Sequence, residues 1–201
     1  MVILGLTGQS GAGKGVFSDV AKEYDVFAVL DTDKTAREVV CKGQPCLEEL
    51  VKCFSEEILN EDGTLNRRKL ASIAFSDENK HLQLNKITHF YITQKIQEWI
   101  SDCKKNNVRC AIIDAPLLFE SGTDKLCDIT LGIICPYETR LERILCRDCI
   151  DEKNARLRLD SQPKDSFFRE KCTYILENDG CRQDFEKKSR QFIDDVVLSM
   201  S

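Results

Sequence analysis

The most informative segment of this chain is Gly8-Gln9-Ser10-Gly11-Ala12-Gly13-Lys14-Gly15. An apolar, strand-like run precedes it, and a segment with helical character follows it. A strand, a glycine-rich loop ending in lysine and a helix are the parts of a phosphate loop. The glycines permit backbone conformations in which successive amides face one anion, and the helix N-terminus adds the positive end of its dipole. We therefore expect a polyphosphate to bind here.

The lysine of this loop carries the positive charge that the polyphosphate needs. Lys14 reaches the β- and γ-phosphates of a bound nucleotide in such a loop, where it acts as a point charge. A glycine-rich turn that binds no nucleotide is the alternative, and the combined strand, glycines, lysine and helix disfavour it. The residues predicted to contact the phosphates of ATP are Gly11, Ala12, Gly13, Lys14, Gly15 and Val16.

Position 15 departs from the usual motif. A phosphate loop normally continues after the lysine with Ser or Thr, whose hydroxyl coordinates the Mg²⁺ of the nucleotide. Gly15 offers no such ligand. Water or a carboxylate at a strand end can replace the hydroxyl, because Mg²⁺ commonly keeps several waters. Weaker metal binding with slower turnover is the alternative, so the sequence leaves the metal ligand open.

Along the rest of the chain, strand-like runs alternate with segments that have helical periodicity. The runs cover residues 2–6, 26–30, 110–113, 129–134 and 173–176. Several are apolar at successive positions, which is typical of parallel strands that are buried on both faces. The pattern predicts a three-layer α/β/α sandwich with a parallel five-stranded sheet.

The helical segments lie mainly in one long interval. Residues 35–105 are too many for a single crossover, and an amphipathic pattern runs from about Lys80 to Trp99. We predict a helical lobe inserted between two strands, with a turn at residues 61–64 and a helix start at residues 76–78. Helical spacing at residues 184–200 predicts a closing helix.

Composition limits the classes of function. The chain has 201 residues, 42% of them hydrophobic, and a net charge of -5. One core with a small lobe fits this length, and the acidic balance argues against a general nucleic-acid binder. No apolar run approaches the ~20 residues of a membrane span, so we expect a cytoplasmic protein. The eleven cysteines are odd in number and irregularly spaced, which favours free thiols over disulfides or a zinc site at Cys146 and Cys149.

Carboxylates follow two of the predicted strands. Asp31 and Asp33 come after one strand, and Asp114 ends another. In an open parallel sheet the carboxyl ends of the strands border the ligand crevice. Asp33 is our candidate for the group that accepts the proton of an attacking hydroxyl, and Asp31 or Asp114 supports the metal shell or the substrate. Ordinary turn or N-cap acids are the alternative interpretation of Asp31 and Asp33.

An arginine-rich helix and an apolar loop complete the candidate residues. Arg140, Arg143 and Arg147 are spaced to share one helical face, where arginines can stabilise a transferring phosphoryl group. A solvated face paired with nearby acids is the alternative. Residues 117–120 form an apolar loop, which either packs against an organic substrate or closes the core.

These pieces, in this order, resemble the dephospho-CoA kinase family. The resemblance spans nearly the whole chain and is most specific at residues 31–39 and 114–120. Further matches are Asn66-Arg67-Arg68-Lys69-Leu70, Ile87-Thr88-His89, Leu141-Glu142-Arg143 with Arg147-Asp148, and Arg156-Leu157-Arg158 to Gln162. It implies a P-loop kinase fold over residues 1–201, a helical CoA-binding lobe at residues 42–105 and a lid at residues 139–162.

The resemblance also implies an activity and a site. ATP with Mg²⁺ would phosphorylate the ribose 3'-hydroxyl of dephospho-CoA, the final step of coenzyme A biosynthesis, with no obligate protein partner. Asp33 would act as the base, Lys14 with Arg143 or Arg147 would contact phosphates, and Asn178 would lie near the adenine. The implied substrate-binding residues are Asp31, Arg37, His89, Asp114, Pro116, Leu117, Leu118, Phe119 and Glu120.

Two positions depart from the family pattern, and two other functions stay open. Gly15 replaces the metal-binding hydroxyl residue, and Phe90 follows His89 where the family usually has Pro. The first departure affects metal affinity and the second only a local turn. The alternatives are a P-loop kinase with another nucleoside or nucleotide acceptor, and a nucleotide-binding protein whose catalysis is impaired by Gly15.

Overall fold

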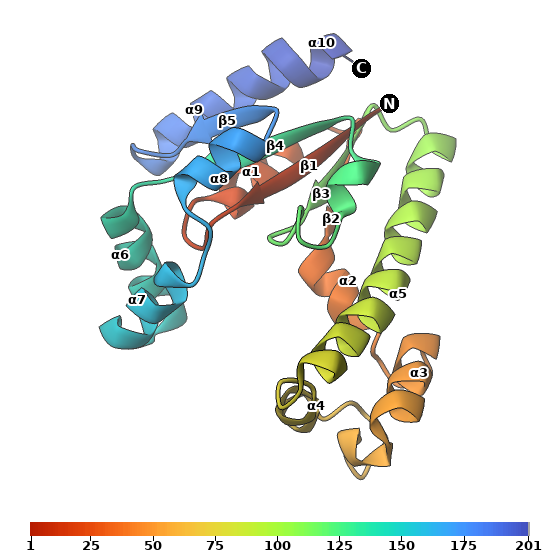
Figure 1. Cartoon of the computed structure of the whole chain (residues 1–201). Helices are drawn as coiled ribbons and strands as arrows, with labels where there is room; N and C mark the ends of the chain where they lie inside the picture. Colours follow the sequence, from red (N-terminus) through yellow and green to blue (C-terminus); the bar gives the residue numbers. More distant parts are fainter. Residues whose placement is uncertain (201) are drawn as a thin grey trace. The chain divides into compact units, whose positions relative to one another are not determined.

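The structure, a computed structural model that describes residues 1–200, contains a five-stranded parallel sheet (Figure 1). The strand order is β2-β3-β1-β4-β5. The strands are β1 (Val2–Gly8), β2 (Phe27–Asp31), β3 (Cys110–Asp114), β4 (Ile129–Ile134) and β5 (Tyr174–Glu177). All five strands predicted from the sequence are confirmed, each within three residues of its expected ends.

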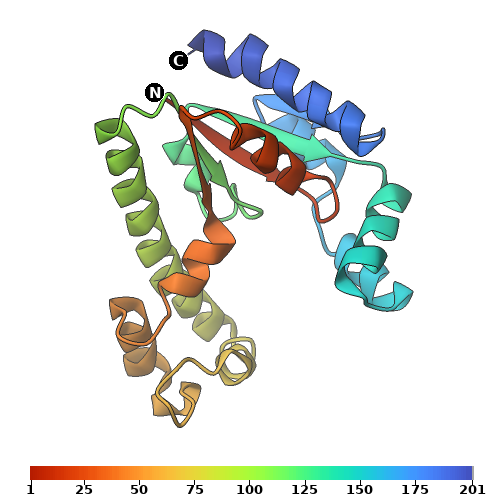
Figure 2. The ribbon, with the colours of Figure 1, turned by 180° about the vertical axis from the view of Figure 1, so that it is seen from behind.

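Two helices, one near each end of the chain, pack against one face of the sheet. Leu4 and Leu6 of β1 share a buried cluster with Phe17 of α1 (Lys14–Ala21) and Phe185 of α9 (Arg182–Phe192). Figure 2 shows α1 and α9 lying side by side across this face. Because α1 is anchored by this cluster, the loop that precedes it is fixed at the carboxyl end of β1.

The opposite face is covered by the segments around η2 (Thr123–Leu126) and α8 (Asp165–Lys171). A side chain at Gly5 would meet Leu118 and Cys127, and one at Gly132 would meet Cys172. The connection between two parallel strands of a sheet is right-handed. Two connections that run in opposite directions from the sheet centre therefore place their helices on opposite faces of the sheet. The β1–β2 and β4–β5 connections do run in opposite directions from the sheet centre. The predicted three-layer α/β/α sandwich is therefore confirmed.

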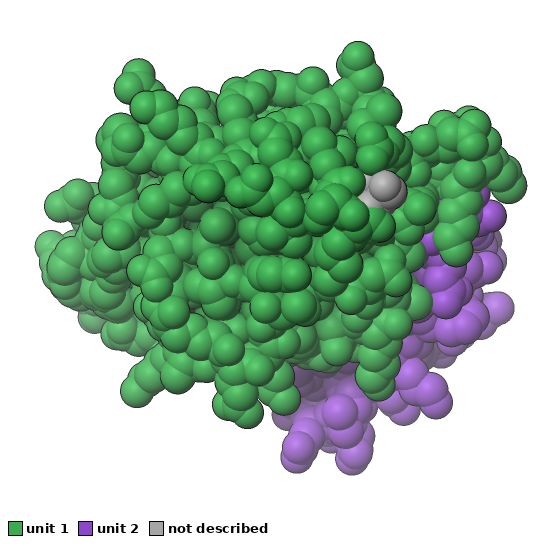
Figure 3. Space-filling view, turned by 90° about the horizontal axis from the view of Figure 1, so that it is seen from above, with its two compact units in different colours: residues 1–31, 102–201 green, residues 32–101 purple. Residues whose placement is uncertain are grey.

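The chain divides into two compact units: the sheet unit, of residues 1–31 and 102 onward, and the helical unit, of residues 32–101 (Figure 3). The helical unit holds α2 (Thr32–Glu38), α3 (Pro45–Phe54), η1 (Glu56–Ile58), α4 (Arg67–Ala74) and most of α5 (Glu78–Lys105). Its buried cluster centres on Leu50, Phe54, Ile58 and Leu70. The lobe expected at residues 42–105 overlaps this unit.

Side-chain hydrogen bonds stabilise the predicted helix start and the predicted turn of the helical unit. The Asp77 carboxylate accepts from the Asn79 and Lys80 amides at 2.7 and 3.2 Å, which starts α5 at the expected place. In the predicted turn, Gly63 has φ 78° and the Asp62 carboxylate accepts from the Thr64 amide at 2.9 Å. Both predictions are confirmed.

Two further helices and the C-terminal segment complete the sheet unit. Helices α6 (Tyr137–Asp148) and α7 (Glu152–Asp160) pack on each other through Leu141, Ile144, Ala155 and Leu159. The closing helix is interrupted: α9 leads into a π-helical turn, η3 (Ile193–Val197), and then α10 (Leu198–Met200). None of the helices within residues 1–200 combines the length and the apolar character that a membrane crossing requires.

Candidate active site

The phosphate loop connects β1 to α1 at the carboxyl edge of the sheet. Gly13, the N-cap residue of α1, has φ 111°, a backbone conformation that residues other than glycine rarely adopt. Gly8 has φ 146°, and a Cβ there would lie 2.3 Å from the Ile133 carbonyl oxygen. The Lys14 Nζ donates to the Gly8 carbonyl at 2.8 Å. The lysine ammonium therefore lies across the loop, on the side of Gly8.

Two side chains from elsewhere in the sheet unit hold the loop from outside. Asn178 follows β5 and is buried, and its Nδ2 donates to the Ala12 carbonyl at 2.7 Å. Arg143 of α6 donates from Nη1 to the Gly11 carbonyl at 3.2 Å and from Nη2 to the Asn178 Oδ1 at 3.4 Å. The structure thus brings together Lys14, Arg143 and Asn178, three residues that the sequence analysis assigned to ATP.

The three arginines of α6 have different surroundings. Arg140 is buried, with its Nε donating to the Cys135 carbonyl at 3.0 Å and its guanidinium over the Tyr137 ring. Arg147 lies next to Asp148, to which its Nε donates at 2.6 Å. Arg158 of α7 also donates to Asp148, at 2.7 Å. Arg147 therefore fits the alternative interpretation of the arginine face, in which the side chain pairs with a nearby acid. Arg143, in contrast, contacts the phosphate loop.

Sequence reasoning missed a second connection to the loop, which comes from the segment between α7 and α8. The Gln162 Oε1 accepts from the Ser10 amide at 3.0 Å, and the Gln162 Nε2 donates to the Ser10 Oγ at 2.8 Å. Beside this pair, the Gln9 Nε2 donates to the Pro163 carbonyl at 2.8 Å. Gln9, Gln162 and Pro163 carry no sequence pattern that indicates these contacts.

The strand-end carboxylates lie on adjacent strands. Asp31 of β2 and Asp114 of β3 are register partners, so both occupy the carboxyl edge of the sheet. The Asp114 Oδ2 accepts from the Ser18 Oγ of α1 at 3.1 Å, which fixes this carboxylate beside the helix that follows the phosphate loop. Asp33 lies in the first turn of α2, in the helical unit.

These residues fit a Mg²⁺ ion that is bound mainly by nucleotide and water. A Cβ built at Gly15 has nothing within 4 Å, so the position of the missing hydroxyl is open. Within residues 1–200, no group of three or more His, Cys, Asp or Glu side chains could by itself hold a metal ion. Asp31 and Asp114 are the carboxylates that would hold hydrated Mg²⁺ at this edge of the sheet, because Mg²⁺ usually retains several waters.

The loop of residues 116–120 divides into buried and exposed parts. Leu118 is fully buried against Gly5, whereas Leu117 is 60% exposed. The Phe119 ring packs edge-on against Phe167 at 5.7 Å between centroids, and the Pro116 carbonyl accepts from the Thr7 hydroxyl at 3.3 Å. Leu118 therefore closes the core, and Leu117 is the apolar side chain that the loop presents to solvent.

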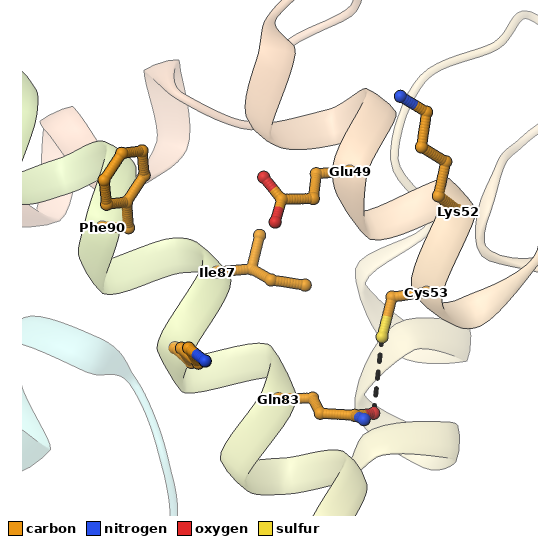
Figure 4. Close-up of a pocket in the computed structure, with 7 residues that line it drawn as sticks. Glu49, Lys52, Cys53, Gln83, Ile87 and Phe90 are labelled. Carbon is orange, nitrogen blue, oxygen red and sulfur yellow. Dashed lines mark hydrogen bonds between the residues drawn. The ribbon is translucent and has the colours of Figure 1, made fainter.

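The helical unit has a groove of about 530 Å³ between α3 and α5. Lys52 and Lys86 lie on opposite walls, and Ile87 and the 63% exposed Phe90 make its apolar part. Figure 4 shows that Cys53 and Gln83 face each other across the groove, with the thiol donating to the Gln83 Oε1 at 3.4 Å. His89 is the neighbour of Phe90 on α5, and Arg37 lies in the last turn of α2.

The strand order, the loop after the central strand and the helical unit after β2 define a P-loop kinase fold. The family model for dephospho-CoA kinase matches residues 2–184. The chain belongs to the dephospho-CoA kinase family.

Individual relatives agree with this assignment. The dephospho-CoA kinase of Corynebacterium glutamicum is 35% identical over 98% of this chain and 100% of its own length. Among solved structures, dephospho-CoA kinase from Campylobacter jejuni is 26% identical, with a TM-score of 0.74 over 99% of this chain and 98% of its own. The structure of TT1252 from Thermus thermophilus gives a TM-score of 0.81 at 27% identity, covering 97% of both chains.

Proposed function

We propose that this protein transfers the γ-phosphoryl group of ATP to the ribose 3'-hydroxyl of dephospho-CoA, completing coenzyme A. The observation that carries the proposal is the formed phosphate loop, with Lys14 across it and Arg143 and Asn178 behind it, in a chain that belongs to this family over most of its length. The eleven cysteines are free thiols, which supports a reducing compartment such as the cytoplasm.

The donor half of the reaction depends on positive charge and fixed geometry. The loop amides bind the α- and β-phosphates, Lys14 reaches the β- and γ-phosphates, and Arg143 adds a second cation beside the loop. Phosphoryl transfer needs little covalent chemistry from the protein, so positioning and charge neutralisation supply most of the catalysis. Mg²⁺, when bound with ATP, neutralises phosphate charge, and Asp31 and Asp114 are the residues that would orient its waters.

The residues assigned to the acceptor half are Asp33, Arg37, His89 and the loop of residues 116–120. We assign Asp33 as the base that accepts the proton of the 3'-hydroxyl, since a carboxylate accepts the proton of the attacking hydroxyl in protein kinases. Arg37 and His89 belong to the same unit as Asp33 and are assigned to the acceptor. Leu117, exposed on its loop, gives the acceptor an apolar contact.

The groove between α3 and α5 suits the diphosphate and pantetheine part of the acceptor. Lys52 and Lys86 form no ion pair or hydrogen bond with other residues in the described part of the chain, so both ammonium groups are available to a phosphate. Ile87 and Phe90 offer apolar contact to an alkyl arm. Dephospho-CoA carries both kinds of group, whereas a simple nucleoside acceptor carries neither.

A substrate panel tests this proposal directly. Purified protein is incubated with ATP, Mg²⁺ and either dephospho-CoA, a nucleoside or a nucleoside monophosphate, and consumption of ATP is followed. We expect turnover with dephospho-CoA alone, and near-complete loss of it in Asp33→Asn. Turnover with another acceptor would refute the substrate, and an active Asp33→Asn protein would remove Asp33 as the base. Nucleotide binding without any turnover would favour the binding-protein alternative.

A further inference from the structure

The contact between Gln162 and Ser10 occupies a backbone donor of the phosphate loop. The amide groups of such a loop serve as donors to anions, yet the Ser10 amide already donates to a side-chain oxygen, the Gln162 Oε1, at 3.0 Å. The Gln162 Nε2 simultaneously donates to the Ser10 hydroxyl at 2.8 Å. The Gln162 carboxamide oxygen thus stands where an acceptor oxygen of a bound anion would accept from the same amide.

The position of Ser10 identifies the phosphate concerned. Lys14 contacts the β- and γ-phosphates of a nucleotide, and its Nζ lies 2.8 Å from the Gly8 carbonyl oxygen. The first half of the loop, from Gly8 to Ser10, therefore lies on the side of the lysine ammonium. The second half, from Gly11 to Gly13, is held by Arg143 and Asn178 and leads into the helix N-terminus. Ser10 accordingly lies on the side of the β- and γ-phosphates, of which ADP lacks the γ-phosphate.

Gln162 also connects this part of the loop to α6 and α7. It lies two residues after the end of α7 at Asp160, and α6 contacts the other half of the loop through Arg143. The adjacent bond from the Gln9 Nε2 to the Pro163 carbonyl anchors the same segment independently of the Gln162 side chain. A change confined to the Gln162 carboxamide therefore leaves the hydrogen bond from Gln9 to Pro163 between this segment and the loop.

We propose that Gln162 binds the γ-phosphate of ATP and makes the loop favour ATP over ADP. In the nucleotide-free protein its carboxamide caps the Ser10 amide. When ATP is bound, a γ-phosphate oxygen accepts from the Ser10 amide, and the Gln162 Nε2 donates to the same phosphate. ADP lacks this phosphate, so Gln162 stays on Ser10. The inference rests on the proposed nucleotide site and adds a specificity residue to it.

Gln162→Glu is the decisive variant. A carboxylate still accepts from the Ser10 amide and hydroxyl, so the contact within the loop is kept, but the Nε2 donor is replaced by an oxygen that repels a phosphate. We expect affinity for a non-hydrolysable ATP analogue to fall roughly 10- to 100-fold, the range for a lost hydrogen bond to a charged group. Affinity for ADP, measured by the same calorimetric titration, should change less than about threefold. Gln97→Glu, the same substitution at an exposed site on α5, is the matched control.

Each outcome decides the proposal. A selective loss of ATP-analogue affinity in Gln162→Glu, absent from Gln97→Glu, supports it. Equal losses for both nucleotides, or no loss for either, would show that Gln162 only braces the loop and would overturn it. Failure of the wild-type protein to bind either nucleotide would instead refute the nucleotide site itself.

Discussion

Two glycines of the phosphate loop should respond in opposite directions to the same substitution. In Gly13→Ala the new Cβ lies 2.3 Å from the Asn178 Nδ2, at a residue whose φ is 111°. The backbone strain costs about 1–3 kcal/mol, and displacing Asn178 from the Ala12 carbonyl costs about 1 kcal/mol more. We therefore expect Gly13→Ala to lower the free energy of unfolding by roughly 2–4 kcal/mol.

Gly15→Ala is the matched control two residues away. Gly15 lies in the first turn of α1, and a Cβ there has nothing within 4 Å. Replacing a helical glycine by alanine removes backbone freedom from the unfolded chain, so stability should rise by up to about 1 kcal/mol.

Thermal unfolding with and without ADP measures both effects. At about 2–4 °C per kcal/mol for a chain of this size, Gly13→Ala should lower the Tm by roughly 5–15 °C, and Gly15→Ala should leave it equal or slightly higher. ADP should raise the Tm of Gly15→Ala and of the wild type but not that of Gly13→Ala. Equal destabilisation by the two substitutions, or a Gly13→Ala protein as stable as the wild type, would refute the loop geometry.

Three further predictions concern the metal, the arginines and the thiols. Gly15→Ser places a hydroxyl in the open space beside the loop. The Mg²⁺ concentration that gives half of the maximal rate should therefore fall roughly fivefold, which corresponds to about 1 kcal/mol of Mg²⁺ binding free energy. An unchanged Mg²⁺ requirement would contradict the open ligand position. Arg143→Lys should weaken ATP binding more than Arg147→Lys, because Arg143 contacts the loop and Arg147 is paired with Asp148; the reverse order in calorimetry would contradict this. Burial raises the pKa of Cys110 and Cys127 from 9.0 to about 12 and that of Cys46 and Cys172 to about 11. The buried neutral thiols contribute their full stabilisation below pH 9, the ordinary pKa of a thiol. Above pH 9 the unfolded chain loses protons that the folded protein keeps, so the free energy of unfolding, measured with urea, should fall from pH 9 toward pH 11. A rise over that interval would contradict the burial.

The parts of the fold that sequence predicted well are those set by local patterns. The strands are continuous apolar runs, the phosphate loop is a contiguous motif, and the start of α5 depends on Asp77 and its neighbours. The interruption of the C-terminal helix at residues 193–197 was not predicted, because its apolar spacing continues through the π-helical turn. Periodicity reports which face is buried, not the hydrogen-bond pattern of the backbone.

The candidate site shows the same limit at the level of side chains. Spacing placed Arg140, Arg143 and Arg147 on one face, but burial and a neighbouring acid give each a different role. The pairing of Gln162 with Ser10 joins residues 152 positions apart, and no local pattern encodes it. Loop motifs could be found from sequence, whereas contacts made between the loop and distant segments required the fold.

The most direct test of the account is to identify the product. Wild-type protein is incubated with dephospho-CoA, Mg²⁺ and ATP labelled in its γ-phosphate, and the acceptor is analysed by mass spectrometry and by NMR of its ribose. We predict that one labelled phosphate is transferred to the 3'-hydroxyl and that Lys14→Ala abolishes the transfer. Unmodified dephospho-CoA alongside tightly bound ATP, or a phosphate attached at another position, would contradict the proposed reaction.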